Sequence, residues 1–299
     1  MVVSASFCND GRQLTIAKAL SAPAFHRWLV PALGDWAAIL CAYALGFWLD
    51  QTVVWLAVIV LIGNRQHALG IMGHDGTHFA AARRRWLNDW ASELLCFWPL
   101  VTGLADFRRF HLNHHRYFNT DRDPELLFKN HWSRAQWQLP QSRAEIMGRF
   151  LLDMLGFGVY EVAKAYWLLG KTCARSWVGP ACWWVVVGGL LYLAHLEFAI
   201  VIWFAALTTS FWGFFRLRTW IEHVGTDTTH RLRANWWQRL LITPHGSWSH
   251  YEHHDYPAVP FWRRHALRPS NAPTVTMQEL FASFDARRSV PVERRRLAG

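Results

Sequence analysis

The fold is decided by residues 28–73, which read WLVPALGDWAAILCAYALGFWLDQTVVWLAVIVLIGNRQHALGIMG. Two apolar runs, 28–49 and 52–73, are separated in this stretch only by Asp50 and Gln51. Because a bilayer core of about 30 Å takes roughly 20 helical residues, each run is long enough to cross a membrane. The sequence therefore predicts a transmembrane helical hairpin.

A second apolar tract covers residues 177–217, and as one helix it would reach roughly twice the thickness of a membrane. Polar residues gather at 194–197, so we expect a turn there, with one span on each side, 177–194 and 197–217. The tract thus predicts a second transmembrane hairpin.

Two other apolar segments are not expected to cross the membrane. Residues 91–104 are too few and contain Pro99, which favours an interfacial or re-entrant piece. Residues 150–170 carry polar side chains at helical spacing, which indicates an amphipathic helix lying on the membrane surface.

The expected architecture is an all-α integral membrane protein with four transmembrane helices in two hairpins. We expect one domain over residues 1–299. Its parts are the four spans, a helical cytoplasmic cap made of 74–176 and 218–284, and a basic tail at 285–299.

Composition supports this class. Hydrophobic residues make up 52% of the chain and charged residues only 17%, against roughly 25% in an average soluble domain, which excludes a disordered chain. Five cysteines without CxxC spacing exclude a disulfide framework. Residues 1–27 have no continuous apolar core before a cleavage site, so no signal peptide is expected.

The net charge of +10 raises the question of nucleic acid binding, which the distribution of basic residues answers. Of 31 Lys and Arg, 14 lie in 74–176 and 12 in 218–299, while the connections near 50–51 and 195–197 carry none. This positive-inside pattern predicts cytoplasmic termini and a cytoplasmic cap. The excess of Arg over Lys suggests a bacterial cytoplasmic membrane, and no nucleic acid partner is expected.

Histidines form three boxes beside the expected spans: GHDGTH at 73–78, FRRFHLNHHRYFNTDRDPE at 107–125 and SHYEHHDYPAVPFWR at 249–263. Helical residues three and four apart share a face, so each box can direct two or three imidazoles to one point. Neutral imidazole binds Fe, Zn, Cu or Ni. With no crossing between the first two boxes and two crossings before the third, all three emerge on the same side of the membrane.

On these three motifs, residues 50–270 resemble the membrane fatty acid desaturase family. The resemblance implies two iron ions that use O₂ to attack an unactivated C–H bond in a lipid chain. It also implies a further histidine at the end of the last span, which His223 in TWIEHVG matches. The implied metal ligands are His74, His78, His111, His114, His115, His223, His250, His253 and His254.

The resemblance implies a desaturase that introduces a double bond into a fatty acyl or similar lipid chain. A hydroxylase or ketolase of the same family, acting on a carotenoid or another apolar chain, stays open because the same ligands support either outcome. A zinc membrane hydrolase or a metal transporter is the alternative outside the family. The sequence has no HPGG haem motif and no cysteine cluster, so we expect an external electron donor, ferredoxin-like or cytochrome b5-like.

Four carboxylates near the boxes could orient ligand imidazoles or could be ordinary surface charges: Asp75, Asp123, Glu222 and Glu252. Arg108 and Arg109 could bind a phosphate or lipid headgroup, or serve as positive-inside anchors.

Other polar residues are expected to have structural roles. Asp35 and Arg65 are expected to snorkel or to pair, and His245 is interpreted as a loop histidine, with ligation as the alternative. Structural or solvated roles are expected for His26, His67, His131, His195, His230 and His265.

Overall fold

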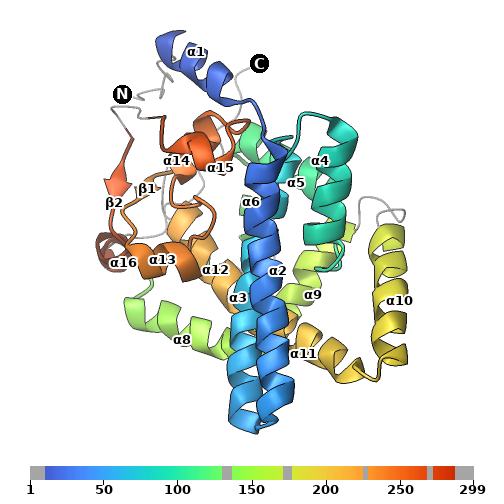
Figure 1. Ribbon diagram of the computed structural model, residues 1–299. Helices are drawn as coiled ribbons and strands as arrows, with labels where there is room; N and C mark the ends of the chain where they lie inside the picture. The colour runs from blue at the N-terminus through green and yellow to red at the C-terminus, as the bar shows by residue number, and fades with distance from the viewer. Residues whose placement is uncertain (1–10, 130–136, 171–176, 225–227, 268–271, 287–299) are drawn as a thin grey trace.

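The computed structural model describes residues 11–129, 137–170, 177–224, 228–267 and 272–286. These residues are mostly helical (Figure 1). The first half of the chain forms α1 (Gly11–Leu20), α2 (Phe25–Leu49), α3 (Thr52–Thr77), α4 (Arg85–Ser92), a π-helical turn η1 (Glu93–Phe97), α5 (Leu104–Tyr117), α6 (Pro124–Leu127), α8 (Arg143–Met154) and α9 (Val159–Gly170). The second half forms α10 (Val178–Leu193), α11 (Glu197–Thr208), α12 (Ser210–His223), β1 (Arg231–Leu232), α13 (Trp236–Leu241), α14 (His250–Asp255), α15 (Phe261–Arg264), β2 (Thr274–Val275) and α16 (Met277–Ala286).

The first apolar hairpin is formed by α2 and α3, which run side by side with their turn at the lower end of Figure 1. Asp50 makes the turn with a φ of 41°, and its N–H donates to Gly46 O. Both helices are long and apolar enough to cross a membrane, as predicted. The third span-length segment is Glu197–His223, which α11 and α12 form together with a break at Thr209.

The turn between α10 and α11 lies where the sequence predicts it, at residues 194–196, and includes His195 with a φ of 57°. Because α10 has 16 residues and rises about 1.5 Å for each, it is shorter than a bilayer core of about 30 Å. Within the described residues, three helical segments have the length and composition of a span. The fourth span stays a proposal.

Residues 150–170 contain no span-length helix, as expected, but they do not form the single amphipathic helix that the sequence predicts. The segment is divided between α8 and α9, with Gly156 at a φ of 88° in the break. Asp153 and Glu161 are buried, and Asp153 accepts a 2.6 Å hydrogen bond from Arg216 Nε on α12. The helical spacing had placed Asp153 on a solvent-facing side. Its ion pair with Arg216 on α12 explains why it is buried instead.

The core is built around α3, which packs against α2, α11 and α12. Its largest apolar cluster joins α2, α3 and α11, and Phe211 of α12 packs against it. The main buried members are Trp28, Ile39, Ile62, Leu69, Met72 and Trp203. α3 and α12 come close together at Gly63, where an added Cβ would lie 2.5 Å from Phe211 N. Ser210 Oγ donates a 2.8 Å hydrogen bond to Ile59 O at the same level. Small residues let α3 and α12 come this close, a device typical of membrane helices.

α8 and the elements after α12 form a cap beside α12 (Figure 1). A second apolar cluster holds it together, with Trp220 and Phe284 fully buried at its centre. The cap also contains a short parallel β pair, in which Arg231 is opposite Thr274. The protein is thus mostly helical rather than all-α, and residues 287–299 of the expected basic tail lie outside the described residues.

Candidate metal centre

Three helices deliver the histidine boxes. The last turn of α3 carries His74, α5 carries His111, His114 and His115, and α14 carries the third box. The spacing of three and four residues puts the imidazoles of each box on one helix face, as the sequence predicts. These faces meet at the buried junction of α3, α5, α12 and α14, at the end of α3 remote from the α2–α3 turn.

Five histidines form what we call the first cluster: His74, His78, His111, His115 and His253. One side-chain nitrogen from each lies within 4.8 Å of the others. His115 Nε2 is at its centre, 2.9 Å from both His111 Nε2 and His253 Nε2. Boxes two and three, far apart in the sequence, therefore direct their nitrogens to one point.

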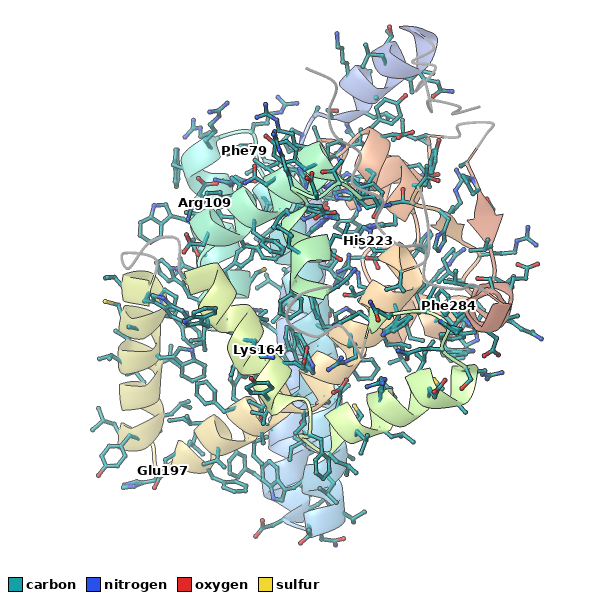
Figure 2. The ribbon with its side chains drawn as sticks, turned by 180° about the vertical axis from the view of Figure 1, so that it is seen from behind. Phe79, Arg109, Lys164, Glu197, His223 and Phe284 are labelled. Atoms are coloured by element: carbon teal, nitrogen blue, oxygen red, sulfur yellow. The ribbon has the colours of Figure 1, made fainter. Side chains whose placement is uncertain are left out.

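The second cluster consists of His114, His223, His250 and His254. Side-chain nitrogens of His114, His223 and His254 lie within 4.8 Å of one another, and His250 Nε2 lies 2.9 Å from His223 Nε2. The imidazoles of His115 and His254 stack with centroids 4.3 Å apart, so the clusters are adjacent. Figure 2 shows His223 inside the molecule, distant from Glu197 at the other end of the same apolar segment.

All nine histidines that the family resemblance implies as ligands lie in one of the two clusters. Their role as metal ligands stays a prediction. His223 belongs to no box and is the last residue of α12, so only the resemblance pointed to it.

The electrostatic state of the imidazoles suits metal binding. Burial lowers the pKa of His78, His111, His250, His253 and His254, and that of His115 falls to about 3. Within the described residues, His74 and one ring nitrogen each of His78, His114, His253 and His254 have no hydrogen-bond partner. Neutral imidazoles with unpartnered nitrogens are the form that divalent transition metals bind, so these residues fit a two-metal centre.

His114 has a raised pKa, unlike the imidazoles named above. Its burial disfavours the charged ring, but Glu125 and Asp123 outweigh this and raise the pKa of His114. Asp123 Oδ1 lies 2.9 Å from His114 Nδ1, and Glu125 Oε2 lies 3.5 Å from the same nitrogen. The Nδ1–H is therefore held by carboxylates, which leaves Nε2 for a metal.

The four carboxylates near the boxes have different roles. Asp123 contacts the imidazole of His114 and orients it, which is one of the two roles that the sequence left open for these carboxylates. Glu222 Oε2 lies 3.6 Å from His250 Nδ1 and 2.8 Å from Arg218 Nη2. The remaining two pair with arginines instead of imidazoles: Asp75 with Arg264 and Glu252 with Arg231.

Arg108 makes its hydrogen bonds inside the fold. Its Nε donates to Thr77 O at 3.0 Å, Nη2 to Gly76 O at 3.0 Å, and both Nη atoms to Asp89. It therefore caps the last carbonyls of α3 beside His78, a role that sequence reasoning missed. Arg109 is half exposed and pairs with Asp106.

His245 lies outside both clusters. Its Nε2 is 2.6 Å from Asp35 Oδ2, and the other oxygen of Asp35 accepts a 3.1 Å hydrogen bond from Arg65 Nη1. The predicted pairing of Asp35 and Arg65 is thus confirmed. Of the isolated histidines, His67 and His230 are buried, His26, His195 and His265 are exposed, and His131 lies outside the described residues.

Comparison with known proteins gives one family match. Residues 51–284 match the model of the family described as fatty acid desaturase. The chain is 25% identical over 238 residues to sn-1 oleoyl-lipid 12-desaturase of Anabaena variabilis, which covers 73% of this chain and 56% of that protein. It is 23% identical over 256 residues to sn-1 oleoyl-lipid 12-desaturase of Synechocystis sp., covering 74% and 65%.

A third relative is dihydrorhizobitoxine desaturase of Bradyrhizobium elkanii, 23% identical over 252 residues, with coverage of 77% of this chain and 69% of that protein. The chain therefore spans less than two thirds of the length of the two 12-desaturases. The shared region contains the three histidine boxes and His223.

Proposed function

This chain belongs to the fatty acid desaturase family, and we propose that it is an O₂-dependent membrane di-iron oxidoreductase that introduces a double bond into a fatty acyl or similar lipid chain. The convergence of nine histidines in two adjacent clusters carries this proposal. The printed names of the relatives agree with it, because all three are desaturases.

The position of the clusters suits an apolar substrate. His74 lies near the end of the apolar helix α3, and His223 ends the apolar segment formed by α11 and α12. A lipid chain in the bilayer could thus approach the clusters along apolar helices without entering water. Burial of the site would exclude water from the reacting carbons.

The reaction requires an oxidant, and two bound irons would supply it by activating O₂. Overall, –CH₂–CH₂– with O₂, two electrons and two protons would give –CH=CH– and two molecules of water. The nine imidazoles would hold the irons, while Asp123 fixes the ring of His114 and Arg108 fixes the end of α3. The two electrons would come from an external one-electron carrier, ferredoxin-like or cytochrome b5-like.

We also propose that α10 is the fourth span and that the clusters face the cytoplasm. Boxes two and three share one site, so the chain between them must cross the membrane an even number of times. The segment Glu197–His223 supplies one crossing, and among the described residues α10, which precedes it in a hairpin, is the apolar helix that can supply the other. The basic residues of the cap support the cytoplasmic orientation.

The test is expression in a bacterial host that lacks lipid desaturases, followed by lipid profiling without preselection. We expect O₂-dependent products that lack two hydrogens, and purified protein with about two irons per chain. His253→Ala should abolish the product, whereas His265→Ala, in which an exposed histidine is removed, should leave it unchanged.

Products that carry one additional oxygen would show that the protein is a hydroxylase and not a desaturase. Native protein that contains zinc without iron and consumes no O₂ would contradict the whole proposal and favour a hydrolase or transporter.

A further inference from the structure

The two histidine clusters differ in the charges around them. Within the described residues, no hydrogen bond or ion pair joins a carboxylate to an imidazole of the first cluster. Two buried acids are adjacent in sequence to its histidines, and each pairs with an arginine: Asp75 with Arg264 and Glu252 with Arg231. The first cluster is therefore an all-imidazole site beside compensated ion pairs.

Three carboxylates lie against the second cluster. Asp123 is 2.9 Å from His114 Nδ1, Glu222 is 3.6 Å from His250 Nδ1, and Glu125 Oε2 is 4.0 Å from His223 Nε2. Two of the three have cationic partners. Lys129 Nζ lies 2.6 Å from Glu125, and Arg218 Nη2 lies 2.8 Å from Glu222.

Asp123 is the member whose partner is a histidine. Its side chain is 2% exposed, and among the described residues it pairs with no lysine or arginine. It accepts hydrogen bonds from the backbone N–H groups of Asn119, Glu125 and Leu126 besides its contact with His114. A buried carboxylate is costly unless a positive charge is near, and a metal cation bound to His114 Nε2 would supply that charge in place of a proton on the ring.

We infer that Asp123, with Glu125 beside it, makes the second cluster the tighter of the two metal positions, an inference that rests on the proposed di-iron function. A carboxylate on the outer nitrogen of a ligating histidine fixes the ring and makes it a stronger ligand, and loss of such a carboxylate costs about 10–100-fold in metal affinity. The first cluster has more imidazoles but no such carboxylate. It should fill second.

The test removes the native metal from the protein and titrates it with Co²⁺ alone. Binding is detected by the absorption of the bound Co²⁺. Two backgrounds isolate the positions: His254→Ala disables the second cluster and His78→Ala disables the first. Wild type should bind in two steps, and His78→Ala should keep the tighter one.

Asp123→Asn is the diagnostic change, because asparagine keeps an oxygen that can cap α6 while it removes the charge. It should weaken Co²⁺ binding about 10–100-fold in the His78→Ala background and leave binding in the His254→Ala background unchanged. Asp121→Asn, an exposed change of the same charge two residues away, should alter neither.

Equal weakening in both backgrounds, or none in either, would overturn the inference. If the double variants do not fold, Glu125→Gln in the otherwise intact chain serves instead: the tighter step should weaken and the other should not. The Co²⁺ titration does not depend on a lipid product. A protein that fails to desaturate lipids would therefore contradict the proposed function, while the order of metal binding could still be measured.

Discussion

Asp75 and Arg264 form a buried ion pair that joins the helix of the first histidine box to the segment after the third. Asp75 Oδ1 accepts from Arg264 Nη2, and Asp75 Oδ2 accepts from the backbone N–H of Phe261 at 3.0 Å. Arg264 Nε also donates to Val259 O at 3.1 Å. The pair fixes α15 against the end of α3, and thus box three against box one.

Arg264→Met should destabilise the protein by about 3–5 kcal/mol, because it leaves the carboxylate of Asp75 buried without its cation. The double variant Asp75→Asn with Arg264→Met should recover a large part of this loss, since no unpaired charge remains. The measurement is thermal unfolding in detergent, followed by tryptophan fluorescence. Arg83→Met, at an exposed arginine, is the control, and equal losses in the single and double variants would refute the explanation.

Gly63→Ala should weaken the packing of α3 against α12. A Cβ at Gly63 would overlap Ser210 Oγ and lie 2.5 Å from Phe211 N, so the helices would have to separate. Overpacking of this kind costs about 1–3 kcal/mol, which the same unfolding assay can detect. Gly189→Ala on α10 is the matched control, because its Cβ would meet no atom within 4 Å and should be neutral or slightly stabilising. Similar losses at both glycines would contradict this account.

Sequence patterns predicted the parts of this fold that depend on local periodicity. The α2–α3 hairpin and the turn at 194–196 follow from where apolar runs stop, and the grouping of imidazoles in each box follows from spacing along one helix. These features require no knowledge of which segments pack together.

The features that sequence reasoning missed depend on contacts between distant segments. The division of 150–170 into α8 and α9 coincides with the ion pair of Asp153 with Arg216, more than 60 residues away. Arg108 follows no pattern that would identify it as the cap of α3, because its acceptors lie some 31 residues earlier. Likewise, Asp75 and Asp123 both stand near boxes, yet tertiary neighbours give one an arginine and the other an imidazole.

Glu93→Gln should make stability less dependent on pH. Burial raises the pKa of Glu93 from 4.5 to about 7, partly opposed by the hydrogen bond from Leu104 N and supported by Asp89. A raised carboxyl pKa means that the folded state holds the proton more tightly than the unfolded state, so stability falls as pH rises from about 4.5 to about 7. The advantage of the glutamine variant in unfolding temperature should therefore be small at pH 5 and reach its full size near pH 8. A constant difference across this range would contradict the titration of Glu93.

His245→Ala should separate a structural histidine from a metal ligand. His245 Nε2 contacts the 4% exposed Asp35, whose other oxygen is bound by Arg65, so the alanine variant leaves one buried carboxylate oxygen without its partner. Such a loss costs about 1–3 kcal/mol, which should lower the unfolding temperature. Iron content should stay at the wild-type level, because His245 belongs to neither histidine cluster. His254→Ala should show the reverse, with iron lost from the second cluster, since its ring lies among His114, His223 and His250. Loss of iron from folded His245→Ala protein would instead make His245 a ligand, because a residue that only supports the Asp35–Arg65 pair has no direct effect on the metal.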